Sequence, residues 1–273
     1  MNYKKLTLRF SLISAPIVIF STVLLLLCFK FNFDAKAGYF VDGVLPTIFL
    51  IFYIAGLIIS FVAAIMLNKA QAIKTSNEIG NYKIPLLILA MLLTACAIAF
   101  NIVLSDANTL FLVLGTCFFA VYALLCAANK GFRTSAIKIL LIYLSAGLPI
   151  SMIIYNNSNV TRHINSVENT LTVVFGLACM IYILYEAKRI YTGMHSRWHY
   201  CSMLLVLHTG ATLSISYILA YLSGNVVEKS RLLQAITILL ATCTVGIELF
   251  KFVREAEGVS EAEGASDAEG VGK

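Results

Sequence analysis

Eight apolar runs of about 20 residues each divide this sequence, and they constrain its fold more than any other feature. A helix of that length crosses the hydrocarbon core of a bilayer. We therefore predict an all-α, polytopic membrane protein, a bundle of eight transmembrane helices. The runs cover residues 11–29, 44–67, 84–104, 109–128, 137–155, 169–185, 200–223 and 232–250.

The composition agrees with a chain that lies mostly in lipid. Of its 273 residues, 60% are hydrophobic and only 12% are charged, whereas a soluble domain carries about 25% charged residues. The longest loop between predicted spans, 68–83, has 16 residues, which leaves no room for a separate soluble catalytic domain. We predict one transmembrane domain over residues 1–254, followed by a tail over 255–273.

The basic residues predict the orientation of the bundle. When the loops are assigned alternately to two sides, one side receives fifteen Lys and Arg and the other receives five. Cytoplasmic loops carry an excess of Lys and Arg, so the pattern predicts that both termini are cytoplasmic. It also explains the basic charge without nucleic-acid binding. We expect a multi-pass protein of a cell membrane, and specifically of a bacterial plasma membrane.

The tail after residue 254 has a different composition from the rest of the chain. It consists of an acidic hexapeptide repeat, EAEGVS, EAEGAS and DAEGVG, and it carries a net charge of −5, against +11 for residues 1–254. A segment with so little apolar surface cannot bury enough of it to fold, so we predict disorder. The tail is interpreted either as a solubilising segment or as a docking segment for a basic protein partner.

The predicted helix over 200–223 is the strongest candidate to line a functional interior. His208, Thr212 and Ser216 follow one another at intervals of four residues, which places them on one helical face. Ionisable groups inside a membrane are costly and often functional, so this stripe is a candidate path for a solute or proton. The alternative is a neutral histidine that hydrogen-bonds a neighbouring helix, with hydroxyls that serve packing.

Two further polar residues are candidates for a solute or ion path. Asn101 lies toward the outer end of its predicted helix, where an amide either bridges helices or contacts a solute. Glu248 lies near the inner end of the last helix and is followed by Lys251, as Glu186 is followed by Lys188 and Arg189. Ion pairing or snorkelling at the interface is the structural alternative for both acids.

Two of the predicted helices carry local signals. Gly56, Ser60 and Ala64 repeat every four residues, which favours close contact with another helix. In the fifth run, Gly147 and Pro149 lie close enough together to predict a kink.

The sequence predicts no cofactor, no metal site and no catalytic residues. Seven cysteines are present without a C-x-x-C pair, and neither a Walker A motif nor a dinucleotide glycine fingerprint occurs. His195 and His199 have the spacing of a helical metal pair, but Ser196 stands where the zinc-protease motif has glutamate. With Trp198 between them, we interpret these histidines as an interfacial anchor.

These features favour a permease-like protein, or the membrane subunit of one, that binds or moves a small solute between helices. Compact bundles with short loops and a discontinuous helix are common among transporters. The first alternative is a membrane sensor or scaffold that acts through a protein partner. The second is an intramembrane lipid-modifying enzyme, for which the sequence offers only scattered polar residues.

Overall fold

The computed structural model describes the backbone of residues 3–34, 39–41, 43–67, 73–74, 82–104, 109–128, 136–158, 167–226 and 228–270, and side chains no further than residue 254. Nearly all of it is α-helix. The helices are α1 (Tyr3–Phe31), α2 (Val44–Met66), α3 (Lys83–Val103), α4 (Thr109–Ala127), α5 (Ala136–Leu144), α6 (Gly147–Ser158), α7 (Val167–Thr192), α8 (Arg197–Leu222) and α9 (Lys229–Gly270).

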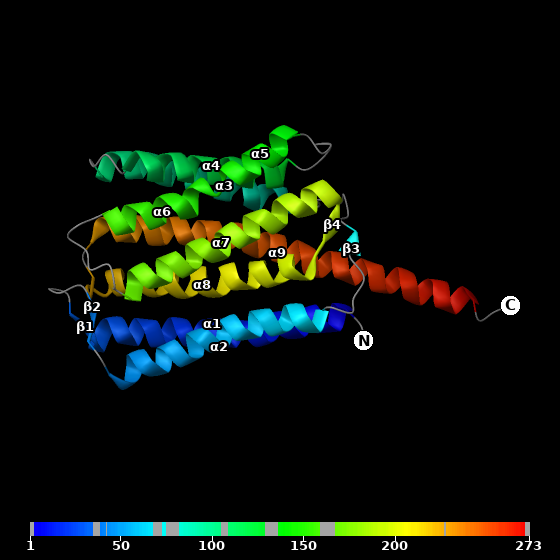
Figure 1. Ribbon diagram of the computed structural model, residues 1–273, viewed down its shortest axis with the longest axis horizontal. Helices are drawn as coiled ribbons and strands as arrows, with labels where there is room; N and C mark the ends of the chain where they lie inside the picture. Colours follow the sequence, from blue (N-terminus) through cyan, green and yellow to red (C-terminus); the bar gives the residue numbers. More distant parts are fainter. Residues whose placement is uncertain are drawn as a thin grey trace.

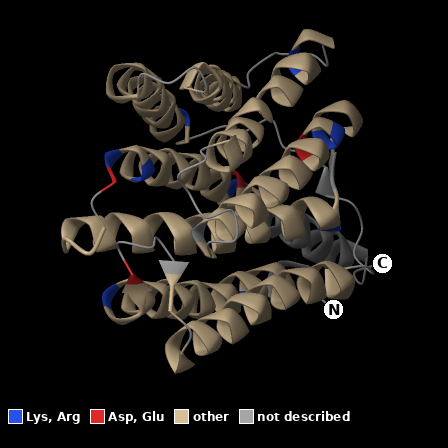
Figure 2. Cartoon of the chain, turned by 60° about the vertical axis from the view of Figure 1, so that its left-hand side comes forward, with Lys and Arg blue, Asp and Glu red and all other residues tan. Residues whose placement is uncertain are grey.

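Eight spans in this part of the chain are long and apolar enough to cross a membrane. The all-helical, multi-pass prediction is confirmed to this extent. Helices suit these sequences because each backbone N–H bonds a carbonyl within its own segment, so none is left unpaired in lipid. Exposed large apolar side chains, such as Ile102 and Ile19, cover the outside of the bundle, while the charged residues gather toward the ends of the spans (Figure 2).

The fifth span, for which Gly147 and Pro149 predict a kink, is divided into two helices. α5 ends at Leu144, and α6 begins at Gly147 after a turn at Ser145 and Ala146. The Ser145 hydroxyl donates a hydrogen bond of 2.5 Å to the carbonyl of Ile142 at the end of α5. Pro149 falls in the first turn of α6, where its missing N–H costs no helical hydrogen bond.

Two short antiparallel pairs tie loops together at the two ends of the bundle. β1 (Phe33–Asp34) pairs with β2 (Tyr39–Phe40) at one end. β3 (Ile73–Lys74) pairs with β4 (Met194–His195) at the end that also holds the N-terminus (Figure 1). We call this second end the basic end, because most Lys and Arg of the chain flank it, and we call the other the β1–β2 end.

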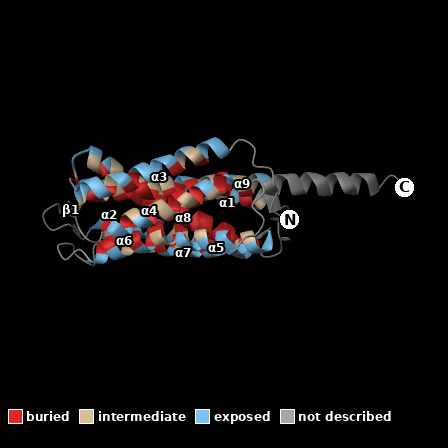
Figure 3. Cartoon of the chain, turned by 90° about the horizontal axis from the view of Figure 1, so that it is seen from above, coloured by how far each residue is buried: buried red, intermediate tan, exposed pale blue. Residues whose placement is uncertain are grey.

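α8 is the centre of the bundle. It packs against α1 and α2 on one side and against α7 and α9 on the other, and α3, α4 and α6 lie beyond α9 and α7 (Figure 1). α8 is also the most buried of the eight described spans, and buried residues gather along it when the bundle is viewed from above (Figure 3). The helix singled out from the sequence therefore occupies the interior.

α9 runs from Lys229 through Gly270, so its helical backbone includes most of the segment for which we predict disorder. The side chains of residues 255–273 lie outside the described residues. The prediction of a disordered tail therefore stays a prediction.

Candidate functional site

The stripe on α8 faces α1 and α2. His208 Nε2 lies 3.0 Å from the backbone carbonyl oxygen of Tyr53 on α2. The Ser216 hydroxyl lies 2.9 Å from the carbonyl oxygen of Thr22 on α1 and 2.7 Å from that of Thr212. The Thr212 hydroxyl is buried and has no hydrogen-bond partner among the described residues. All three side chains are buried at contacts between helices, which is the geometry of the structural alternative.

α2 makes room for the histidine with a glycine. A Cβ built on Gly56 would lie 2.3 Å from Cε1 of His208, so only a residue without a side chain permits this contact. Gly56, Ser60 and Ala64 are all buried, in agreement with the predicted small-residue contact surface.

Asn101 and Glu248 lie at opposite ends of the bundle. Asn101 is exposed, two residues from the end of α3 at the β1–β2 end. Glu248 is buried near the basic end of α9. The structure therefore brings neither of them to the α8 stripe, and the solute-path roles predicted for these residues stay predictions.

Glu248 belongs to a buried cluster of charged side chains that sequence reasoning did not assemble. We call it the basic-end cluster; its members are Glu186 and Arg189 of α7, His199 of α8, and Glu248 and Lys251 of α9. Glu186 is fully buried, His199 is 1% exposed and Glu248 is 6% exposed. Both acids are paired within the bundle, Glu186 with Arg189 and Glu248 with Lys251.

Glu186 is the centre of this cluster. Arg189 Nε donates a hydrogen bond of 2.7 Å to Glu186 Oε2, and a second guanidinium nitrogen donates to Oε1, so the pair is bidentate. His199 Nε2 lies 3.1 Å from Glu186 Oε2. Arg189 also reaches Glu248, with Nη2 at 3.8 Å from Oε2, and Lys251 Nζ donates to Glu248 at 2.6 Å. Charges held out of water are stable only when paired in this way.

Aromatic residues and a small cavity complete the basic-end cluster. The His199 ring stacks on Tyr182 with centroids 5.5 Å apart, and the hydroxyls of Tyr182 and Tyr122 lie 2.5 Å apart. A cavity of about 10 Å³ adjoins Glu186, Arg189 and Glu248, and Lys138 of α5 also lines it. This volume is at the lower limit for one water molecule, so the cluster is closed to larger solutes in this conformation.

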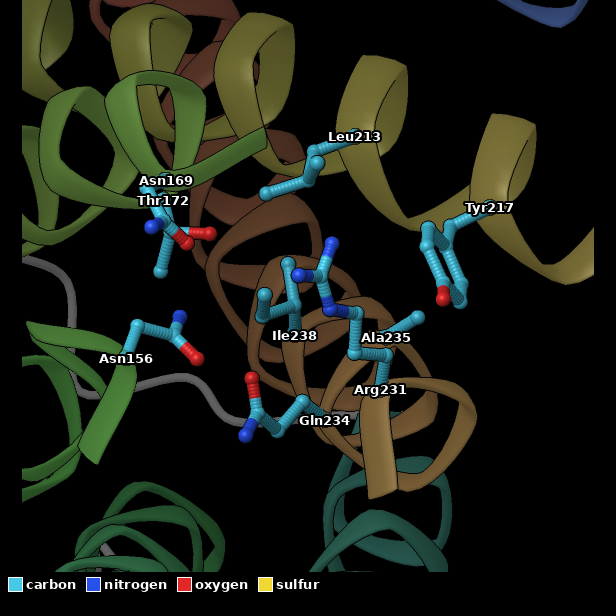
Figure 4. Close-up of a pocket in the computed structure, with 9 residues that line it drawn as sticks. All are labelled: Asn156, Asn169, Thr172, Leu213, Tyr217, Arg231, Gln234, Ala235 and Ile238. Carbon is cyan, nitrogen blue, oxygen red and sulfur yellow. The ribbon is translucent and has the colours of Figure 1, made fainter. Parts of the chain in front are cut away.

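A second polar cavity lies at the other end of the same helices. We call it the β1–β2-end pocket; it has a volume of about 30 Å³. Polar side chains of α6, α7 and α9 converge on it (Figure 4). Its lining consists of Asn156, Asn169, Thr172, Leu213, Tyr217, Arg231, Gln234, Ala235 and Ile238.

Gln234 is the least satisfied group of this pocket. Its side chain is 5% exposed, and its amide nitrogen has no hydrogen-bond partner in the described part of the chain. Arg231 Nε lies 2.8 Å from a carboxylate oxygen of Glu228, which is 43% exposed. The pocket thus offers amide, hydroxyl and guanidinium groups within a buried setting.

The two polar regions are aligned along the bundle axis. On α7, Thr172 lines the β1–β2-end pocket and Glu186 lines the cavity at the basic end. On α9, Gln234 lines the β1–β2-end pocket and Glu248 lines the cavity at the basic end. Both intervals are 14 residues, or about 21 Å of helix. The broken span also contributes to both cavities, through Lys138 of α5 and Asn156 of α6.

Apolar residues close the interval between the two cavities. Phe175 and Cys179 of α7 and Ala241 and Val245 of α9 are all buried there. Thr242 and Thr244 interrupt this apolar stretch, but their hydroxyls donate to the carbonyls of Ile238 and Leu240 in their own helix. We call the two cavities with this closed interval the polar column.

No protein-family model matches the chain, and no curated protein or solved structure matches it significantly. The candidate site therefore rests on its own geometry.

The sequence contained a signal for the basic-end cluster. Glu186 with Arg189, and Glu248 with Lys251, are acid–base pairs at i,i+3, a spacing at which helical side chains are neighbours. His199 belongs to the cluster and not to an interfacial anchor, because it is buried against Tyr182. His195 lies on β4, outside the helix that holds His199, so the two do not form the helical pair that their spacing allows.

The cluster joins two carboxylates through one guanidinium, because Arg189 contacts both Glu186 and Glu248, while His199 lies against Glu186. Since a guanidinium stays protonated and has no acceptor, Arg189 holds the two carboxylates in place but does not relay a proton between them. Among the described residues, no group of three or more His, Cys, Asp or Glu side chains is arranged to hold a metal ion.

Proposed function

We propose that this protein is a permease-like protein that moves a small polar solute along the polar column between α5–α6, α7, α8 and α9. The alignment of two buried polar cavities on the same helices is the observation that carries the proposal. Buried polar groups inside a membrane bundle are costly, and they commonly mark a solute or ion pathway. A bundle held together only by packing has no need of polar groups at both ends of one column.

The side chains favour a solute with an anionic group. In the β1–β2-end pocket, Arg231 is paired with Glu228, which is 43% exposed, and the amides of Asn156 and Gln234 line the same pocket. A carboxylate that took the place of Glu228 would meet the guanidinium and these amides. At the other end, Arg189 is shared between Glu186 and Glu248, and its 3.8 Å contact with Glu248 is the longer one. An arriving anion would take the place of Glu248 as a partner of Arg189 or Lys251.

Movement requires a change of conformation, because cavities of about 30 and 10 Å³ admit no more than water. The turn at Ser145 and Ala146 is the hinge that we propose for this change. Discontinuous helices beside a midplane pathway are a common feature of transporters.

We propose a plasma-membrane location with both termini in the cytoplasm. The excess of Lys and Arg at the basic end supports this orientation. The basic-end cluster would then open to the cytoplasm and the β1–β2-end pocket to the outside.

Thermal unfolding of the detergent-purified protein against a panel of small carboxylates, amino acids and sugars tests the proposal. A ligand that binds only the folded state stabilises it by about 2.7 kcal/mol at one hundred times its Kd. We expect a stabilising solute whose effect is lost in Gln234→Leu and kept in Asn101→Leu, a control that removes an amide from the exposed end of α3. His208→Ala should lower stability and leave the solute shift intact.

Two results would overturn the proposal. If no solute on the panel stabilises the protein, and the Gln234→Leu variant is as stable as the parent or more so, the column is a structural feature. If solute stabilisation is lost in His208→Ala and kept in Gln234→Leu, the path follows the α8 stripe and not the polar column.

A further inference from the structure

A large groove opens on the outside of the bundle at the basic end. It has a volume of about 550 Å³, which lies within the range of about 300–1,000 Å³ typical of ligand pockets. α8 forms its floor with Cys201 and Leu205, and its sides are Phe61 of α2 and Ile181 and Leu184 of α7. It is separate from the polar column, whose residues face the interior of the bundle.

The groove extends along about two thirds of the depth of one leaflet. Its lining on α7 runs from Lys188, near the end of the helix, to Ile181. Seven residues of helix span about 10 Å, and half of a hydrocarbon core is about 15 Å. The apolar sides therefore lie at the depth of the lipid chains in the leaflet next to the basic end.

The mouth of the groove is basic. Lys188 and Trp198 line it, and the Arg197 guanidinium carbon lies 5.5 Å from the Trp198 ring centroid. Within the described part of the chain, neither Lys188 nor Arg197 forms an ion pair. Glu186, two residues before Lys188, is fully buried and paired inside the bundle, so it does not neutralise the mouth.

We propose that this groove binds one anionic phospholipid of the leaflet at the basic end. Its phosphate lies between Lys188 and Arg197, and an acyl chain lies along Ile181, Leu184 and Leu205. Basic residues next to a membrane surface attract anionic lipids, and tryptophan favours the headgroup level. The apolar groove on the opposite side of the membrane, of about 310 Å³ between Leu25, Phe40 and Leu50, has no basic residue among those that line it, so charge distinguishes the two.

The experiment is a thermal unfolding titration of the full-length protein in mixed micelles. The probes are phosphatidylglycerol, phosphatidylcholine with the same acyl chains, and glycerol phosphate without chains. We expect phosphatidylglycerol to stabilise the protein at a lower concentration than phosphatidylcholine. Glycerol phosphate should have no effect, since it lacks the chain that fills the groove.

Substitutions at the mouth and in the groove separate specific binding from general charge. Each basic residue near a membrane surface contributes about a fivefold gain in affinity for anionic lipid, so Lys188→Gln/Arg197→Gln should weaken phosphatidylglycerol about 30-fold. Lys83→Gln removes an exposed lysine from the start of α3, which also lies at the basic end, and should change the affinity for phosphatidylglycerol little. Ile181→Trp fills the groove and should also weaken lipid binding, whereas Leu177→Trp, one turn away and also exposed on the outside of the bundle, should not.

Three outcomes would contradict the lipid site. The first is equal stabilisation by both lipids. The second is an effect of glycerol phosphate as large as that of phosphatidylglycerol, which would indicate a site for a free anion. The third is a phosphatidylglycerol response unchanged in both Lys188→Gln/Arg197→Gln and Ile181→Trp. Because the groove lies outside the polar column, these outcomes do not depend on the proposed transport function.

Discussion

The contact between Gly56 and His208 shows how single residues set the distance between α2 and α8. The imidazole occupies the space that a side chain on α2 would need, and its Nε2 lies 3.0 Å from the Tyr53 carbonyl. A buried polar ring in this position is stable because it has a partner. His208 thus joins α8 to α2 at a position where a Cβ on residue 56 would push the two helices apart.

Gly56→Ala should therefore destabilise the protein by about 1–3 kcal/mol, the usual cost of overpacking a core. The added Cβ would lie 2.3 Å from the ring unless α2 or His208 moves. Unfolding in detergent measures the loss. In a His208→Ala background the same substitution should cost clearly less, because the ring is gone. Equal costs in the two backgrounds would mean that the helices do not meet through this pair.

Glu186 is the residue on which the basic-end cluster depends. Glu186→Ala leaves Arg189 and His199 buried without their shared partner, and removal of one member of a buried pair costs about 3–5 kcal/mol. Glu228→Ala is the matched control, because its pair with Arg231 is partly exposed and such pairs contribute about 0–1 kcal/mol. Chemical unfolding of both variants checks the contrast. A similar, small loss in both would show that water reaches Glu186.

At the scale of elements, the broken span is held in place by its contact with α4. A Cβ on Gly115 would lie 2.5 Å from the backbone oxygen of Gly147, whereas a Cβ on Gly147 would meet its nearest atoms at 3.4 Å. The two glycines face each other, but only one of them has no space for a methyl group. The start of α6 therefore sits directly against α4.

Gly115→Ala should increase the distance between α4 and α6 and lower the free energy of unfolding by about 1–3 kcal/mol. Gly147→Ala, at the other side of the same contact, should cost less. Thermal unfolding of the two variants in one detergent gives the comparison. If Gly147→Ala is the more harmful substitution, then backbone freedom at the break matters more than its contact with α4.

The sequence predicted the positions of the helices well, but it predicted poorly which helices pack against each other. Run length predicts each span, and the pair Gly147 and Pro149 predicts the break in the fifth. Neither indicates which faces meet, because a lipid-facing surface and a helix–helix surface are both apolar. For that reason the burial of Glu186 and the place of His199 beside it were missed, although the burial of His208 was expected.

For the whole molecule, the distribution of charge predicts the orientation in the membrane. Fifteen Lys and Arg flank one side and five the other, which predicts that the basic end is cytoplasmic. Ser158→Cys at the end of α6 and Thr192→Cys at the end of α7 lie at opposite ends of adjacent spans. A membrane-impermeant thiol reagent added to intact cells should label the first and spare the second until the membrane is opened. The reverse pattern would invert the topology.

Uptake into proteoliposomes tests whether the polar column carries a solute. The substrate is a solute that stabilises the purified protein, and the variants are Gln234→Leu, Glu248→Gln and the control Asn101→Leu. We predict uptake by the parent and by Asn101→Leu, and a loss of at least tenfold, or about 1.4 kcal/mol, in each column variant. Binding without uptake in the parent, or an equal loss in Asn101→Leu, would show that the polar column does not carry the solute.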